Sequence, residues 1–203
     1  MSLTAIKAPI KVKGDNSEEN LGLVHVVTGD GEGKTTSSLG LGLRAIGNNL
    51  TVHMIQFLKS GFTGELYSAK KLGFVIEQFG VDALKEKQKH IEEFSDKTGS
   101  FVFQPDIKEK DAAMEGWEHS KKIIKNGKYD LVIMDEINCV LAKGLIPLAE
   151  VLDVVKHHGK VELVFTGRDA PKELMDAADY VNVIQGVKHP WQKGIVARKG
   201  IEY

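Results

Sequence analysis

The residues with the clearest chemical pattern are Gly29 to Thr36, which read GDGEGKTT and follow an apolar run. Gly33, Lys34 and Thr35 match the last three positions of the phosphate-binding pattern G-x-x-x-x-G-K-[ST]. Glycines let successive backbone N–H groups point at phosphate oxygens, and a helix starting near Lys34 turns its positive dipole end toward them. Lysine adds a cation, and the Thr35 hydroxyl suits Mg²⁺. We therefore predict a nucleotide site with Lys34 and Thr35 as catalytic residues.

Two features of this loop depart from the pattern. The first glycine position falls on Thr28, and the nearest glycine leaves only three residues before Gly33. Asp30 and Glu32 add carboxylates, which lower the expected anion affinity. Only backbone groups need to face the phosphates, so both side chains can point to solvent. The predicted nucleotide-binding residues of the loop are Gly29, Asp30, Gly31, Glu32, Gly33, Lys34 and Thr35.

A second candidate element is the run LVIMDE at 131–136, an apolar strand that ends in two acids. Acids at the end of a buried strand hold Mg²⁺ in phosphate-loop proteins, directly or through water. We predict a metal site formed by Thr35 with Asp135 or Glu136, for Mg²⁺ or alternatively Mn²⁺. VFTGRD at 164–169 ends another strand, and its Arg168 fits a phosphate or carboxylate ligand as well as it fits a surface turn.

Composition limits the class of protein. The 203 residues are 42% hydrophobic, carry a formal net charge of −1 and have a pI of about 6.7. They can form one sizeable core, and no global basic field favours a nucleic-acid partner. The single cysteine, Cys139, cannot form an internal disulfide, which fits a reducing cytoplasm. No apolar run approaches the roughly 20 residues that span a bilayer, so we expect a soluble cytoplasmic protein without a membrane partner.

Several other functions lack their patterns. The closest string to the guanine-reading N-K-x-D is NGKYD at 126–130, which has the wrong spacing and precedes a strand. The protein-kinase string H-R-D-L-x-x-x-N and a Cys/His set with zinc spacing are both missing. We interpret the remaining noteworthy side chains as structural or surface groups: His25, His53, His157, His158 and Trp117.

The elements that must position these residues alternate along the chain. Strands are predicted at 23–27, 51–57, 74–79, 131–135, 161–166 and 180–184. Helices are predicted at 34–47, 64–72, 106–125, 147–157 and 171–178. Several strands are apolar throughout, as in a parallel sheet covered on both faces. We predict an α/β fold of three layers, like that of P-loop NTPases, with a mostly parallel central sheet.

Two segments stand outside this alternation. Residues 1–20 are polar and mixed in charge, and we predict a flexible N-terminal arm. Residues 21–203 then form a single domain, with an insertion near 81–105 that is charged and then aromatic. Long insertions in compact domains are often lids or binding elements, although a surface insertion without a role would have the same kind of sequence.

Beyond these patterns, four blocks resemble one family: TGDGEGKTTSSLGLGLRAIG, VHMIQFLKSG, YDLVIMDEIN and the C-terminal stretch from VFTGRD to GIEY. They look like the P-loop type of ATP:corrinoid adenosyltransferase, such as the cob(I)alamin adenosyltransferases. The resemblance runs from about residue 21 to the C-terminus and is interrupted near 81–98. Its most specific pieces are the short loop, the D-E-[IL]-N strand end and the terminal V-K-H-P…G-I-x-A-x-x-G-I-E-Y.

The resemblance implies a transfer at carbon. Family members move the 5′-deoxyadenosyl group of ATP to the cobalt(I) of a reduced corrinoid, and triphosphate leaves intact. The loop would then hold a leaving group, which fits its altered spacing. The resemblance adds Thr36 to the phosphate contacts, Arg44 as a weaker nucleotide candidate, and Asn138 as a polar residue of the site; Arg44 fits a solvated helix residue equally well.

The corrinoid side rests on the resemblance alone. Family members place aromatic residues near a mobile loop to exclude the lower axial ligand of cobalt, and Phe101 and Phe103 match that pattern with Phe in place of Trp. Family members carry asparagine and lysine where Asp30 and Glu32 stand, which puts the nucleotide affinity in doubt. The resemblance also implies a homodimer, with the arm over a neighbour's site, and a reduced flavoprotein as the electron donor.

Two other functions remain open from the sequence. A P-loop kinase or ATPase acting on another small molecule would release ADP, phosphate or a phosphorylated product, but it needs a residue near the γ-phosphate that orients water or a hydroxyl, and none is identified. A corrinoid or nucleotide carrier without turnover would fit a loop weakened by its two acids. The acceptor is either cobalamin or a biosynthetic precursor, such as cobyrinic acid a,c-diamide.

Overall fold

A computed structural model describes residues 21–59, 63–80 and 107–202 of the chain. Its strands are β1 (Val24–Thr28), β2 (Val52–Phe57), β3 (Val75–Phe79), β4 (Leu131–Asp135), β5 (Glu162–Thr166) and β6 (Tyr180–Val183). Its helices are α1 (Lys34–Ile46), α2 (Gly64–Leu72), α4 (Ile107–Asn126), α5 (Ile137–Ala142), α6 (Leu148–His157), α7 (Lys172–Ala177) and the 3₁₀ helix η2 (Pro190–Lys193).

The six strands form one sheet in the order β3-β2-β4-β5-β1-β6, and every neighbouring pair is parallel. The predicted α/β class and parallel sheet are confirmed. All residues of β2 and β4 are buried, as expected for central strands covered on both faces. Because the strands are parallel, their carboxyl ends meet at one edge, where α/β proteins commonly bind ligands.

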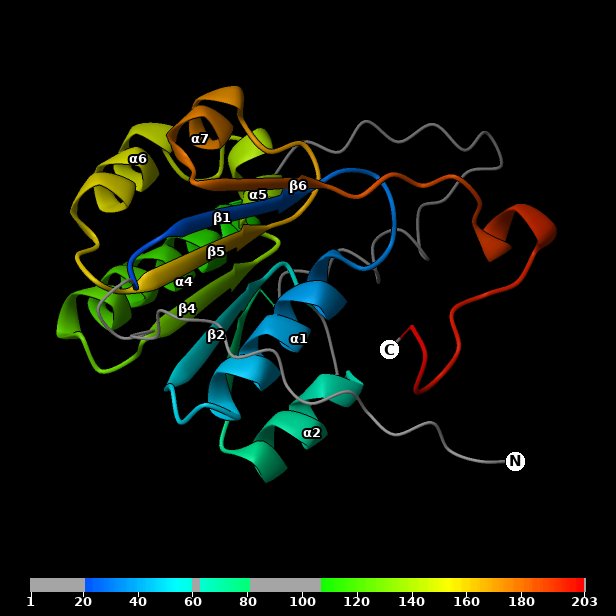
Figure 1. The fold of residues 1–203 in the computed structure, drawn as a ribbon. Helices are drawn as coiled ribbons and strands as arrows, with labels where there is room; N and C mark the ends of the chain where they lie inside the picture. Colours follow the sequence, from blue (N-terminus) through cyan, green and yellow to red (C-terminus); the bar gives the residue numbers. More distant parts are fainter. Residues whose placement is uncertain (1–20, 60–62, 81–106, 203) are drawn as a thin grey trace.

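Helices cover both faces of this sheet (Figure 1). The helices α1 and α2 lie on one face, and α4, α5, α6 and α7 lie on the other. Each side has its own apolar core: Met54, Phe74 and Ile133 belong to the first, and Phe57 and Trp117 to the second. Trp117 is fully buried, which confirms its predicted core role.

The predicted strands agree with the structure to within one residue at each end, but the short helix α5 was not predicted. The predicted arm at 1–20 and the whole of the predicted insertion at 81–105 lie outside the described residues. None of the helices in the described ranges is long and apolar enough to cross a membrane.

Candidate nucleotide site

The predicted phosphate loop lies between β1 and α1, at the carboxyl edge of the sheet. Gly29 and Gly33 adopt φ values of 106° and 113°, a region that side chains strongly disfavour. Gly33 is also the N-cap of α1, and no side chain caps this helix or adds an acid to its first turn. The N–H groups that begin α1 are therefore available to an anion.

The loop rests on the chain that follows β6. The Ile184 N–H donates to the Thr28 carbonyl at 2.8 Å, and the Gly31 N–H donates to the Ile184 carbonyl at 2.9 Å. A Cβ on Gly29 would lie 2.3 Å from the Ile184 oxygen, and one on Gly31 would lie 2.7 Å from the carbonyl carbon of Gln185. These two glycines are required because backbone packs directly against backbone.

The two acids of the loop have different surroundings. One carboxylate oxygen of Asp30 accepts a hydrogen bond from the Gly186 N–H at 3.1 Å. That bond, more than the Asp30 amide itself or the nearby cations, lowers the pKa of Asp30. Glu32 is exposed, and its carboxylate lies 3.8 Å from the His189 ring. Asp30 thus fastens the loop to the chain after β6, while Glu32 stands at its rim.

Lys34 folds back over the loop. Its ammonium donates to the Gly31 carbonyl at 2.6 Å, and the residue is only 8% exposed. Its own carbonyl accepts hydrogen bonds from the hydroxyls of Ser37 and Ser38. The lysine is therefore held where the loop closes, within the first turn of α1.

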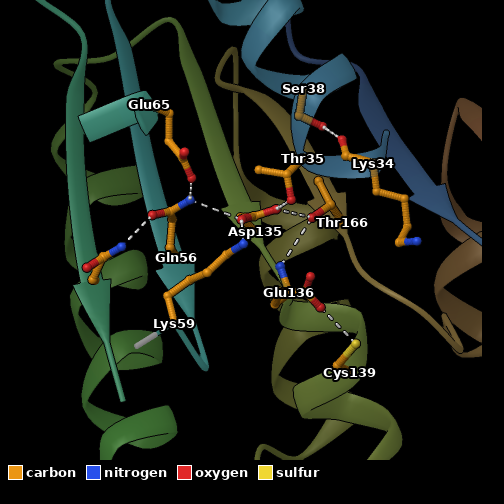
Figure 2. A network of polar contacts seen from close by, with 11 residues as sticks. Lys34, Thr35, Ser38, Gln56, Lys59, Glu65, Asp135, Glu136, Cys139 and Thr166 are labelled. Atoms are coloured by element: carbon orange, nitrogen blue, oxygen red, sulfur yellow. Dashed lines mark hydrogen bonds and ion pairs between the residues drawn. The ribbon is translucent and has the colours of Figure 1, made fainter. Parts of the chain in front are cut away.

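Asp135, at the end of β4, is the centre of a polar network (Figure 2). Its Oδ1 accepts hydrogen bonds from the hydroxyls of Thr35 at 2.9 Å and Thr166 at 2.6 Å. Its Oδ2 accepts from the Gln56 side-chain amide at 3.2 Å and lies 3.6 Å from the Lys59 ammonium. The carboxylate is fully buried, so these partners replace the water that a charged group needs.

Glu136 turns away from this network, as Figure 2 shows. Its backbone is left-handed, with φ of 64°, and its N–H donates to the Thr166 hydroxyl at 3.1 Å. Its carboxylate accepts from the Cys139 thiol at 2.9 Å. Burial, followed by the Glu136 charge, raises the pKa of Cys139 to about 12, so this thiol stays protonated and can donate.

A cleft of about 470 Å³ opens over the loop. It is bounded by the first turn of α1, the start of α2, the ends of the strands and the last residues of the chain. Its charged lining residues are three cations and four carboxylates: Lys34, Lys59, Arg168, Glu32, Glu65, Glu136 and Glu202. These cations do not outnumber the carboxylates, so a multiply charged triphosphate needs a further cation here.

Comparison with known proteins assigns this chain to a family. The family described as ATP:corrinoid adenosyltransferase BtuR/CobO/CobP matches residues 20–203. This chain belongs to that family.

Its relatives are similar over nearly their whole length. Corrinoid adenosyltransferase CobA of Salmonella typhimurium is 29% identical over 202 residues, which cover 98% of this chain and 94% of the relative. The corrinoid adenosyltransferase of Sinorhizobium sp is 30% identical, over 95% of this chain and 85% of the relative. That of Pseudomonas aeruginosa is 31% identical, over 97% and 91%. The predicted resemblance is confirmed, and the chain is a transferase of this family.

The adenosyltransferase brings together many, but not all, of the predicted site residues. Thr36 and Arg168 line the cleft together with Glu32 to Thr35, whereas Gly29, Asp30 and Gly31 are not among its lining residues. Arg44 is exposed in the last turn of α1, nine residues beyond Thr35, and is not among the cleft residues. Asn138 is fully buried below the cleft, where its amide donates to the Gly167 carbonyl at 3.2 Å. Phe101 and Phe103 lie outside the described residues.

Four residues of the network around Asp135 were not predicted: Gln56, Lys59, Glu65 and Thr166. Gln56 donates to both Asp135 and Glu65, and it accepts from Gln78 on the neighbouring strand β3 at 2.9 Å. A signal for them exists in the sequence, because all except Glu65 lie near the carboxyl end of β2 or β5.

The surroundings of Asp135 fit a magnesium ion. One carboxylate and two hydroxyls converge within hydrogen-bonding distance, and such oxygen donors are those that Mg²⁺ prefers. Hydrogen bonds already engage both oxygens of Asp135. An ion would therefore replace the hydrogen bond between Thr35 and Asp135, or it would bind Asp135 through a water molecule. Glu136 could take part only if its carboxylate gave up the hydrogen bond from Cys139.

Proposed function

We propose that this adenosyltransferase transfers the 5′-deoxyadenosyl group of ATP to the cobalt(I) of a reduced corrinoid. The electron pair of cobalt forms the bond to the ribose 5′ carbon, the bond from that carbon to oxygen breaks, and its electron pair leaves with triphosphate. The observation that carries the proposal is the glycine loop before an uncapped helix, beside Lys34 and the Thr35–Asp135 pair. These groups suit the binding of a leaving triphosphate.

The residues act by binding and charge stabilisation. The N–H groups of Glu32 to Thr36, which line the cleft, would hold phosphate oxygens, and Lys34 would exchange the Gly31 carbonyl for one of them. Mg²⁺, held through Thr35 and Asp135, would supply the charge that the lining lacks. Cobalt(I) carries no proton, so the reaction needs no general base. The remaining demand is to hold the reacting atoms in line.

A second hollow offers room for the other substrate. It has a volume of about 840 Å³ and shares Glu32, Arg168 and Glu202 with the nucleotide cleft. Trp191 and Val196, both well exposed, contribute to its lining. A hollow beside the leaving-group site that combines apolar and charged lining residues suits a large planar substrate with polar side groups. We propose that the corrinoid approaches through this hollow, with Phe101 and Phe103 as further predicted contacts.

The cellular setting is also a proposal. We propose a cytoplasmic homodimer that accepts cobalamin or a precursor and receives electrons from a reduced flavoprotein. Support for the dimer comes from the edge strand β6, where Tyr180, Val181 and Val183 are 49%, 43% and 59% exposed. An edge strand with apolar side chains is a surface that proteins usually cover.

The test is an anaerobic reaction of the protein with Mg²⁺, ATP and chemically reduced cob(I)alamin. We expect a light-sensitive adenosylated product and one triphosphate per product. Lys34→Ala should lower kcat by about 10²–10³, as loss of one charge-stabilising donor does. Lys71→Ala, an exposed lysine on α2 outside the cleft, is the matched control and should behave as wild type. Orthophosphate release without a corrinoid product would instead indicate a conventional ATPase or kinase, and binding without either product would indicate a carrier.

A further inference from the structure

A second cluster of chemically active side chains lies away from the nucleotide cleft. His53 on β2, Glu77 on β3 and His119 on α4 converge on the face of the sheet that α4 covers. Glu77 Oε2 lies 2.7 Å from His53 Nε2 and 2.6 Å from His119 Nε2. One ligand atom from each of the three residues lies within 4.8 Å of the other two.

We propose that His53, Glu77 and His119 form a second metal site, which binds one divalent transition-metal ion such as Zn²⁺. The proposal does not depend on the proposed function, because none of these residues lines the nucleotide cleft.

The ligand set fits this class of ion. Two imidazole nitrogens and one carboxylate are a frequent Zn²⁺ set, and three protein ligands leave one position for water. Imidazole favours Zn²⁺, Cu²⁺ or Ni²⁺ over Mg²⁺ and Ca²⁺, which prefer oxygen. Within the described ranges, no other group of three such side chains lies close enough to hold an ion.

The protonation states also suit an ion. Burial lowers the pKa of His53 against the opposing effect of Glu77, so its ring is neutral near pH 7. Burial alone would raise the pKa of Glu77, but the hydrogen bonds from His119 and His53 outweigh it and the pKa is lowered. A neutral imidazole beside an ionised carboxylate is what a metal ion requires.

Binding requires a small rearrangement. Ligand atoms about 2.0–2.1 Å from a tetrahedral ion lie about 3.3 Å apart, so both hydrogen-bonded contacts must widen. The side chains of Glu77 and His119 are 41% and 31% exposed and can move, whereas that of His53 is 3% exposed and anchors the site.

One feature opposes tight binding. An ion on Nε2 of His53 leaves the ring proton on Nδ1, which is buried and has no hydrogen-bond partner among the described residues. Metal-bound histidines usually donate this proton to an acceptor. We therefore expect micromolar rather than picomolar affinity for Zn²⁺.

The alternative is a cluster held by protons alone, in which Glu77 accepts from both rings and no ion binds. The metal-bound cluster and the hydrogen-bonded cluster differ in how the stability of the protein responds to Zn²⁺. An ion would join the edge strand β3 to β2 and α4 by coordination, so the melting temperature would rise with Zn²⁺ concentration.

The experiment uses the full chain, stripped with a chelator, without ATP or corrinoid. Zn²⁺ binding is measured by competition with a chromophoric chelator for wild type, His119→Gln and Glu77→Gln. His157→Gln is the matched control, because the His157 side chain is 72% exposed and lies on α6. Asp135→Asn controls for binding at the nucleotide cleft.

We expect one Zn²⁺ per chain in wild type and both controls, with affinity at least tenfold weaker in the two cluster variants. Zn²⁺ should raise the melting temperature of wild type and His157→Gln but not of His119→Gln. The Co²⁺-loaded wild type should show the visible absorption of a four- or five-coordinate site, which needs no variant to fold. Equal affinity in wild type and the cluster variants, or no binding at micromolar Zn²⁺, would overturn the proposal.

Discussion

Replacing Thr166 by valine tests whether Asp135 is positioned by the network around it. Thr166 is fully buried at the end of β5, where its hydroxyl donates to Asp135 at 2.6 Å and accepts from the Glu136 N–H at 3.1 Å. Valine has nearly the same shape and favours strands, so the backbone and packing change little. The substitution therefore removes two hydrogen bonds and almost nothing else.

The size of the effect follows from the two bonds. A hydrogen bond to a charged group contributes about 1.5–3 kcal/mol, and a buried N–H left without an acceptor costs about 1–3 kcal/mol. The two are not additive, so we expect Thr166→Val to lower the free energy of unfolding by about 3 kcal/mol.

Thr28→Val is the matched control for this prediction. Thr28 ends the neighbouring strand β1, is 6% exposed, and its hydroxyl accepts only from the neutral Ala170 N–H, at 3.2 Å. We expect a loss of about 1–2 kcal/mol, because no charged partner is involved. Urea unfolding measures the free energy of unfolding of both variants, and the comparison requires that their m-values are equal. If Thr166→Val loses no more than Thr28→Val, the hydroxyl does not hold the carboxylate and the reasoning fails.

Two further predictions concern the loop and the start of β1. Gly31→Ala should raise the KM for ATP at least tenfold, because the new Cβ would lie 2.7 Å from the backbone of Gln185. Gly40→Ala is the control, because a Cβ there would have no neighbour within 4 Å. It should stabilise α1 by about 0.5–1 kcal/mol and leave the KM for ATP unchanged. Glu162 accepts from the N–H groups of residues 22 and 23 and contacts the His25 ring, and these contacts outweigh burial and lower its pKa from the ordinary 4.5. Its contribution to stability is thus full above pH 4.5 and is lost as the pH falls through the lower folded pKa. Urea unfolding at a series of pH values should show that the free energy of unfolding of Glu162→Gln falls less with acid than that of wild type. If it falls just as steeply with decreasing pH in both proteins, the prediction is wrong.

The fold and the loop could be predicted because both depend on local sequence. Buried parallel strands are short runs of apolar residues, so their positions can be found from the local sequence alone. The helix α5 has no such signal: its six residues, INCVLA, are too short to show helical periodicity, and they follow directly after the acids Asp135 and Glu136 at the end of β4.

Contacts between distant residues could not be predicted. The carboxylate of Asp30 finds its partner 156 positions away, at Gly186, so the direction of its side chain depends on how β6 pairs with β1. The choice between Asp135 and Glu136 as the residue beside Thr35 likewise depends on the left-handed backbone at Glu136. His53 looked structural because its partners, Glu77 and His119, share no spacing pattern with it.

The strand β2 connects the nucleotide cleft and the proposed second metal site, and its geometry separates them. Gln56 contacts Asp135 on one face of the sheet, whereas His53, three residues earlier, points to the face covered by α4. Three residues of strand span about 10 Å, and the intervening sheet is fully buried at Met54 and Ile55. The oxygen ligands around Asp135 suit Mg²⁺, and the nitrogen ligands around His53 suit Zn²⁺. An ion at either position should therefore leave the affinity of the other nearly unchanged, because the two share no ligand and interact only through this buried sheet.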